Sequence, residues 1–232
     1  MADNTDDKVK DAPAPWTLKG EVAYGFMHGS RPAQELFNEN PDPIQSPFRG
    51  GMGGLLLIRY AESPVGPYDE LILMPGSYQF HDSTYYRISQ IYVSSLDSVI
   101  NGRRNWGIPK KLARFSWKDN NTYVEIFLPD ANEPFCTIRV QPRLYCLPAN
   151  SALIPSSFRT ILQPPLEEND NKNTYLKTIL SSNGWFRPVV QLTEFRTDGK
   201  EIPSHESLPM YTYGVGYEAF TLIFPKVEEV VY

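Results

Sequence analysis

The residues with the clearest potential for chemistry lie in one segment, residues 102–112, which reads GRRNWGIPKKL. Two adjacent lysines, Lys110 and Lys111, follow a proline there, and apolar residues such as Trp106 and Ile108 flank them. A lysine amine is a useful nucleophile at neutral pH only when burial or a neighbouring cation lowers its pKa by several units. Apolar flanks and a second ammonium group are the ingredients for that shift. An isolated Pro-Lys-Lys tripeptide is more often a solvated loop, so this interpretation needs support elsewhere in the chain.

The chemistry open to such an amine is specific. A neutral amine adds to a ketone and loses water to form a Schiff base, whose protonated form withdraws electrons from neighbouring bonds. A carboxylate one carbon away from that iminium can leave as carbon dioxide. The segment is therefore compatible with an enzyme that acts on keto acids.

Motifs for other common chemistries are missing from the sequence. The three histidines, His28, His81 and His205, are far apart and fit no metal-ligand spacing, so we expect no metal site. No nucleophile elbow, P-loop or dinucleotide fingerprint occurs, so we expect no nucleotide cofactor. The glycine cluster at 50–54 runs into the apolar stretch 55–60, whereas a phosphate-binding loop needs a helix behind it. We interpret the cluster as a tight start to a strand.

Several segments, in the right order, resemble the acetoacetate decarboxylase family. Residues 102–112 resemble its Schiff-base loop, in which a glycine–arginine pair precedes Pro-Lys-Lys-Leu. Residues 63–71, SPVGPYDEL, resemble its Gly-x-Tyr-x-Glu segment, and the active-site glutamate of that motif falls on Glu70. Residues 223–232 resemble the closing strand and tail. Residues 16–20, WTLKG, resemble the opening of fungal members, many of which lie in polyketide pathways.

The resemblance implies a role for each matched residue. Lys110 would be the Schiff-base lysine. Lys111 would help to keep Lys110 neutral, either through its charge or by fixing the loop. Glu70 would position the substrate or move protons, and Arg103 would be structural. The implied activity is the decarboxylation of a β-keto acid without cofactor or metal.

Two departures from the family pattern bear on the substrate. The family's classical members carry a further glutamate on the strand before Gly-x-Tyr-x-Glu, where residues 55–58 read LLLI here. Their N-terminal arginine near the substrate carboxylate has only Lys19 or Glu21 as a counterpart. A more apolar pocket suits a larger, polyketide-derived or long-chain β-keto acid. Two alternatives stay open: a Schiff-base aldolase or dehydratase on the same scaffold, and a non-catalytic barrel that binds an apolar ligand.

The elements that position these residues are mostly short strands. Apolar or alternating runs predict strands at 55–60, 70–74, 88–93, 122–128, 135–140, 187–196 and 218–224. The runs at 122–128 and 135–140 are expected to form a hairpin. A short helix is predicted from the capping serines 94–95 to Gly102, with further short helices at 151–162 and 174–181. The resemblance implies a mainly β (α+β) fold, with a barrel-like antiparallel sheet and a few short helices.

Composition places the chain among ordinary globular proteins. Residues 1–15 are polar and charged, which predicts a disordered arm before a single domain at 16–232. The arm lacks an apolar stretch, and Cys136 and Cys146 are too few for a disulfide scaffold, so we expect a cytoplasmic protein. The net charge of −5 and the absence of a long apolar run argue against nucleic-acid and membrane partners. The resemblance implies a homo-oligomer that acts on a small molecule.

Overall fold

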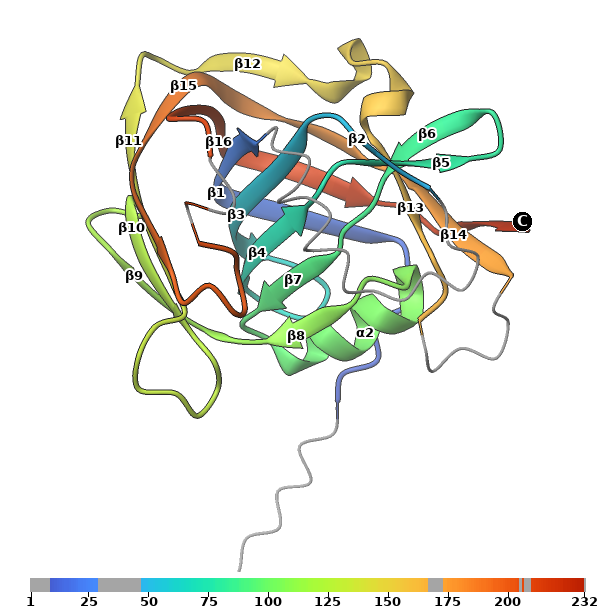
Figure 1. Cartoon of the computed structure of the whole chain (residues 1–232), viewed down its shortest axis with the longest axis horizontal. Coiled ribbons are helices and arrows are strands. Elements are labelled where there is room, and N and C mark those ends of the chain that lie inside the picture. Colours follow the sequence, from blue (N-terminus) through green and yellow to red (C-terminus); the bar gives the residue numbers. More distant parts are fainter. Residues whose placement is uncertain (1–8, 29–46, 167–172, 205, 207–209, 232) are drawn as a thin grey trace, which may run out of the picture.

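The computed structural model describes residues 9–28, 47–166, 173–204, 206 and 210–231. Strands form most of this part of the chain, and a single α-helix, α2, lies along one edge of them (Figure 1). The strands are β1 (Trp16–His28), β2 (Phe48–Gly50), β3 (Gly53–Glu62), β4 (Tyr68–Met74), β5 (Ser77–Phe80), β6 (Ser83–Tyr86), β7 (Gln90–Val93), β8 (Lys110–Leu112), β9 (Arg114–Lys118), β10 (Tyr123–Phe127), β11 (Cys136–Arg143), β12 (Leu147–Asn150), β13 (Thr160–Gln163), β14 (Thr174–Ile179), β15 (Ser181–Thr197), β16 (Tyr213–Phe224) and β17 (Glu228–Val231). The helical elements are α2 (Leu96–Trp106) and the 3₁₀ turns η1 (Ser151–Leu153) and η2 (Ser156–Phe158).

The larger sheet is nearly closed. Its eleven strands run in the order β8-β7-β4-β3-β1-β16-β15-β11-β10-β9, with β12 paired to β15. The two edge strands, β8 and β9, follow each other in the chain with only Ala113 between them, so the edges of the sheet meet. All its pairings are antiparallel except that of β7 with β8. The predicted mainly β, barrel-like fold is confirmed.

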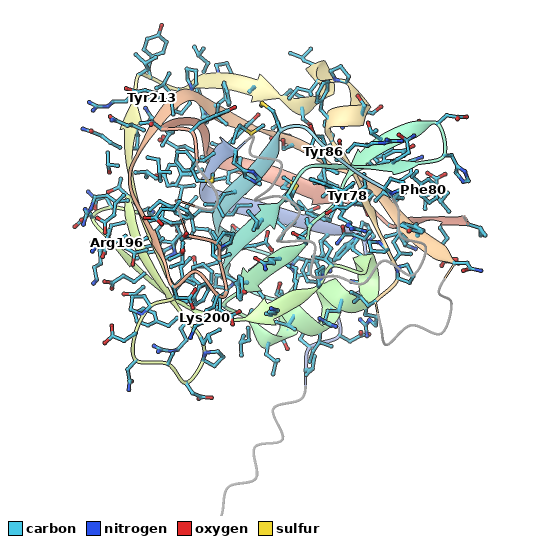
Figure 2. All side chains as sticks on the ribbon, in the orientation of Figure 1. Tyr78, Phe80, Tyr86, Arg196, Lys200 and Tyr213 are labelled. Atoms are coloured by element: carbon cyan, nitrogen blue, oxygen red, sulfur yellow. The ribbon has the colours of Figure 1, made fainter. Side chains whose placement is uncertain are left out.

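A smaller sheet of six strands lies beside the barrel, in the order β17-β14-β13-β6-β5-β2. Its strands β5, β6 and β13 lie at one end of the molecule in Figure 1, and β9, β10 and β11 lie at the other. Side chains follow the same division: Tyr78, Phe80 and Tyr86 gather at the first end, away from Arg196 and Tyr213 (Figure 2). In the part of the chain that the structure describes, no helix is long and apolar enough to cross a membrane.

Two hydrophobic clusters lie on opposite faces of the central strands. The barrel-side cluster is built around Leu55, Leu57, Leu71, Leu73, Tyr92, Val124, Ile126, Ile138 and Val190. The helix-side cluster is built around Trp16, Leu18, Ile58, Tyr60, Tyr68, Ile72, Ile91, Trp106 and Ile108. Because successive side chains of a strand point to opposite faces, β3 and β4 contribute to both clusters.

Strand β1 also contributes to both clusters, because it contains a bulge. Gly20 pairs with Tyr60 and Val22 with Arg59, so two residues of β1 span one step of β3. A bulge of this kind exchanges the faces of the strand beyond it. Trp16 therefore belongs to the helix-side cluster, whereas Phe26 belongs to the barrel-side cluster.

All the strands predicted from the sequence are present, and so is the hairpin of β10 and β11. The predicted helix is present too, and the Ser95 side chain caps it by accepting a hydrogen bond from the Ser98 backbone. Its predicted end at Gly102 was wrong. The helix continues to Trp106 and ends at Gly107, whose φ of 62° is the left-handed conformation that suits glycine.

The other two helix predictions were also wrong. Residues 151–162 form the turns η1 and η2 and then the strand β13. Residues 174–181 contain the strand β14, which pairs with β13 on one side and β17 on the other. Apolar residues at helical spacing suggested a helix there, but short runs do not distinguish the two periods, and partner strands on both sides decide the outcome.

The N-terminal arm is a further correction. Residues 9–15, which the sequence analysis assigned to a disordered arm, pack along α2; residues 1–8 lie outside the described residues. Asn101 accepts a hydrogen bond from the Ala12 backbone and donates to the Lys10 carbonyl. The Ala12 carbonyl accepts from the Trp16 indole and the Asn105 amide. These hydrogen bonds give partners to backbone groups of residues 10 and 12. The polar composition of the segment had suggested that these groups would be solvated instead.

Candidate active site

Lys110 is buried at the edge of the barrel sheet. It opens β8, beside Ile91 of β7, and its side chain is only 5% exposed. The amine Nζ donates to Glu70 Oε2 at 2.9 Å and to Ser98 Oγ at 3.0 Å. It also lies 5.1 Å from the centre of the Tyr68 ring. The lysine that the sequence singled out is thus held in one position by a carboxylate, a hydroxyl and an aromatic face.

Glu70 reaches the amine from β4. It pairs with Ile58 on one side and Val93 on the other, so its side chain projects from the middle of the sheet into the helix-side cluster. Its Oε1 accepts a hydrogen bond from the Tyr60 hydroxyl at 3.3 Å, while Oε2 faces Lys110. Both carboxylate oxygens therefore have donors, as a buried charge requires.

Helix α2 forms the other wall of the site. Ser98 lies in its first turn and is fully buried against the lysine amine. Gly102 follows one turn later, and a Cβ there would lie 2.6 Å from Lys110 Cδ. Glycine at this position is therefore a requirement of the lysine side chain, which passes along the helix surface. This contact accounts for a glycine in the middle of the helix, which ends instead at Gly107.

The surroundings of the ion pair keep its two tyrosines neutral. Burial raises the pKa of Tyr60 well above its ordinary value, and the negative charge of Glu70 raises it further. Burial and the same charge raise the pKa of Tyr68, which also hydrogen-bonds Ser98. Both phenols therefore stay protonated at neutral pH, and Tyr60 can serve as a hydrogen-bond donor to Glu70.

Lys111 is not part of this cluster. Adjacent residues of β8 point to opposite faces, so Lys111 projects away from Lys110 and is half exposed. Its amine lies 3.8 Å from Glu201 Oε2 and 5.6 Å from the centre of the Tyr92 ring. Arg103 donates to the Lys110 carbonyl at 3.4 Å, a contact that ties β8 to the helix. The structure thus brings Lys110 and Glu70 together but not Lys111.

An apolar cavity of about 390 Å³ borders Glu70. Most of its wall is hydrophobic, and its lining includes Gly25, Met27, Gly54, Leu56, Ile58, Tyr60, Glu70, Ile72, Met74, Tyr86, Ile88, Arg159, Ile161, Leu180, Val215, Leu222 and Phe224. A smaller recess holds Lys110 between Trp16, Tyr68 and Trp106. Glu70, Ile72, Ile88 and Phe224 line both spaces, so the carboxylate stands where the amine recess meets the larger cavity.

Sequence reasoning missed four residues of this site: Tyr60, Tyr68, Ser98 and Gly102. Tyr68 lies in the matched segment 63–71, two residues before Glu70. Tyr60 lies opposite Tyr68 on β3. Ser98 and Gly102 are one helical turn apart, on the face that also buries Asn101. Small and polar residues on the buried face of a predicted amphipathic helix are the signal that could have identified them, because such a face marks a close approach.

No group of three or more potential metal ligands gathers among the described residues. The two cysteines are free thiols. Cys136 is buried, and this burial raises the pKa of its thiol far above the ordinary value. Neither cysteine is among the residues that surround Lys110 and Glu70.

Comparisons with known proteins concern the family and the fold of this chain. The family model described as "Acetoacetate decarboxylase (ADC)" matches residues 41–208. Protein NEOXANTHIN-DEFICIENT 1 of Arabidopsis thaliana is 28% identical over 105 residues, which is 45% of this chain and 37% of that protein. The match thus spans little more than a third of that curated relative's length.

Two solved structures share the fold. An acetoacetate decarboxylase from Legionella pneumophila has a TM-score of 0.67 at 14% identity, over 94% of this chain and 88% of that one. The enduracididine biosynthesis enzyme MppR, in complex with the condensation product of pyruvate and imidazole 4-carboxaldehyde, has a TM-score of 0.59 at 12% identity, over 95% and 90% of the two chains. The family match covers well over half of the sequence, and the chain belongs to the acetoacetate decarboxylase family.

Proposed function

We propose that this protein decarboxylates a β-keto acid with an apolar tail, through a Schiff base on Lys110. The observation that carries the proposal is the buried amine 2.9 Å from the Glu70 carboxylate, next to an apolar cavity of about 390 Å³. An enzyme of this kind needs a nucleophilic amine, a group that exchanges protons with it, and a space for the substrate. In this proposal Lys110 is the amine, Glu70 exchanges protons with it, and the cavity holds the substrate.

The first half of the reaction builds the iminium. Glu70 takes a proton from the Lys110 ammonium across their hydrogen bond, which leaves a neutral amine and a neutral acid. Burial favours this neutral pair over isolated charges when the substrate displaces the remaining water. The amine attacks the ketone carbon, and Glu70 returns its proton as the hydroxyl leaves as water. The product is a protonated Schiff base beside a carboxylate.

The second half releases carbon dioxide. The bond between the substrate's α-carbon and its carboxylate breaks, and its electron pair moves into the iminium to give a neutral enamine. A proton delivered through Glu70 to the α-carbon restores the iminium, and water then hydrolyses it to the methyl ketone and the free lysine. The balance is one β-keto carboxylate and one proton converted to one ketone and one carbon dioxide.

Reductive trapping tests this proposal directly. The protein is incubated with acetoacetate or with a long-chain β-keto acid, sodium borohydride is added, and the adduct is located by peptide mass spectrometry. We expect the long-chain acid to modify Lys110, with a mass that shows the loss of carbon dioxide. Evolved carbon dioxide is measured in parallel.

Three variants control this experiment. Lys110→Met should abolish both the adduct and gas evolution, whereas Lys111→Met, one residue away, should keep both. Glu70→Gln keeps a hydrogen-bond partner but cannot take the proton, so we expect turnover to fall by about 10²–10⁴-fold. Folded protein that forms no adduct with either acid would overturn the proposal and favour the non-catalytic binding alternative.

A second candidate is an aldolase or dehydratase that uses the same iminium. The observation in its favour is that β3 places Leu56 and Ile58, and no acid, on the cavity wall beside Glu70. An adduct on Lys110 that keeps the carboxylate mass, without gas evolution, would favour this candidate over decarboxylation.

A further inference from the structure

The cavity follows the sheet in one direction from Glu70. On β4 its lining residues are Glu70, Ile72 and Met74, and their partners on β3 are Ile58, Leu56 and Gly54. Beyond Gly54 the lining continues to Gly53 and the exposed Met52, and on β4 it runs for four residues beyond Glu70. At a rise of about 3.3 Å per residue, this distance is about 13 Å.

Two glycines keep this part of the cavity open. Gly54 pairs with Met74, and Gly25 of β1 pairs with Leu56, so both occupy strand positions on the cavity wall. A Cβ at Gly54 would meet Met74 Cε at 3.5 Å, and one at Gly25 would meet only Val215 at 3.8 Å. Neither position has a backbone conformation or a clash that demands glycine.

Glycine within a strand lowers stability, because it adds unfolded-state entropy and packs no side chain. The backbone at Gly25 and Gly54 would accept other residues, so the consequence of having glycine there is the empty space beside the strand. Here that space is a hydrophobic cavity whose lining includes Glu70, the carboxylate that accepts a hydrogen bond from Lys110.

We infer that the cavity binds an unbranched alkyl tail of about ten carbons, and that Gly54 and Met74 set the limit of its length. This inference rests on the proposed function and names its substrate class. Bonds of about 1.5 Å advance an extended chain by about 1.3 Å per carbon, so 13 Å holds about ten.

The test measures the binding of 2-alkanones, which are the products expected from such acids, by calorimetry as a function of chain length. For the wild-type protein we expect affinity to rise about fourfold per added carbon and to level off near a ten-carbon tail. Gly54→Leu fills the far end, so its plateau should move to tails about four carbons shorter. Met74→Ala enlarges that end, so its plateau should move to longer tails.

Opposite shifts in the two variants separate a length limit from general damage to the fold. 2-Pentanone, whose tail stays near Glu70, should bind all three proteins within about twofold. Gly54→Ala, which adds a single methyl in ordinary contact distance, serves as the mild control, with a shift of about one carbon.

Equilibrium binding also keeps this inference distinct from the proposed chemistry. A length limit that moves as described, without any borohydride adduct on Lys110, would support the tail site and overturn the Schiff-base function. An adduct on Lys110 with the same length profile in all the variants would support the function and overturn the tail site.

Discussion

The two faces of the β3–β4 hairpin have similar apolar content but different packing. On the barrel side, the leucines are at most 2% exposed and fill the space between the strands: Leu55, Leu57, Leu71 and Leu73. On the helix side, neighbouring positions of the same strands border a cavity and hold a charge: Leu56, Ile58, Glu70 and Ile72. The hairpin and its hydrogen bonds are common to both faces.

The difference therefore comes from what covers each face. The barrel side is covered by strands of the same sheet, which close around it and leave little space. The helix side is covered by separate elements: α2, whose Ser98 hydrogen-bonds Tyr68, and the smaller sheet, whose Tyr86 and Ile161 line the cavity. Dense packing gives stability, and the looser cover leaves room for a substrate beside a buried ion pair. The following experiments examine this division.

The largest effect is expected where the helix side buries charge. Lys110→Met leaves Glu70 without its partner, and breaking a buried pair in this way costs about 3–5 kcal/mol of unfolding free energy. Adding Glu70→Leu removes the second charge, so the double variant should recover to within about 1 kcal/mol of the wild type or exceed it. Denaturant titration at pH 7 measures both. A single variant as stable as the wild type would show that the pair contributes no net stabilisation.

A neighbouring pair of leucines compares the faces directly. Leu57→Ala creates a cavity in the packed barrel side and should cost about 2–5 kcal/mol. Leu56→Ala enlarges a space that already exists, so we expect it to cost less than half as much. The free energies of unfolding of the two variants give the comparison, and equal losses would contradict the proposed difference in packing.

The packed face also contains a titratable group, His28. Its ring is fully buried, Nε2 donates to the Met74 carbonyl at 3.1 Å, and burial lowers its pKa to about 4. The unfolded chain takes up a proton below pH 6.5 that the folded protein resists. The contribution of neutral His28 to the free energy of unfolding is therefore complete above about pH 6.5, and it is lost as the pH falls toward 4. The shift of about 2.5 units corresponds to about 3 kcal/mol.

His28→Gln provides the reference for this measurement, since glutamine does not titrate. Asp69 has its pKa raised to about 6, mainly by burial, and contributes the opposite trend between pH 4 and 6. Because Asp69 is present in both proteins, the difference between their stabilities isolates His28. A difference that does not change from pH 7 to pH 4 would contradict a neutral buried imidazole.

The smallest effect is expected at Lys111. Its half-exposed amine pairs with Glu201 at 3.8 Å, a distance and setting in which an ion pair contributes under about 1 kcal/mol. Lys111→Met should therefore change stability by less than that and leave adduct formation at Lys110 intact. Loss of the adduct in a folded Lys111→Met protein would restore the sequence-based role for this residue.

Sequence patterns predicted one part of the site and missed the other for a physical reason. Lys110 and Glu70 belong to local motifs, so their types and spacing were visible in the chain. Ser98 and Gly102 contact Lys110 because α2 packs against β8, and a helix pattern predicts a buried face without stating which strand that face meets. The role assigned to Lys111 followed from adjacency in sequence, which in a strand places two side chains on opposite faces.

Strand prediction succeeded where the local pattern itself is that of a strand, because the barrel runs are apolar or alternating. The stretch 174–181 carries no such pattern, and it becomes a strand because β13 and β17 pair with it on either side. The bulge in β1 is similarly invisible, because buried residues alternate along the strand although they change clusters.

That bulge has a consequence for how the molecule unfolds. Trp16 and Leu18 lie in one cluster and Tyr24 and Phe26 in the other, yet all four belong to one continuous strand, hydrogen-bonded to β3 and β16. Neither cluster can lose its share of β1 without loosening the ladder that supports its neighbour. Two separate hydrophobic clusters are thus coupled into one cooperative unit, which should melt in a single transition, with the buried Lys110 protected until the barrel itself opens.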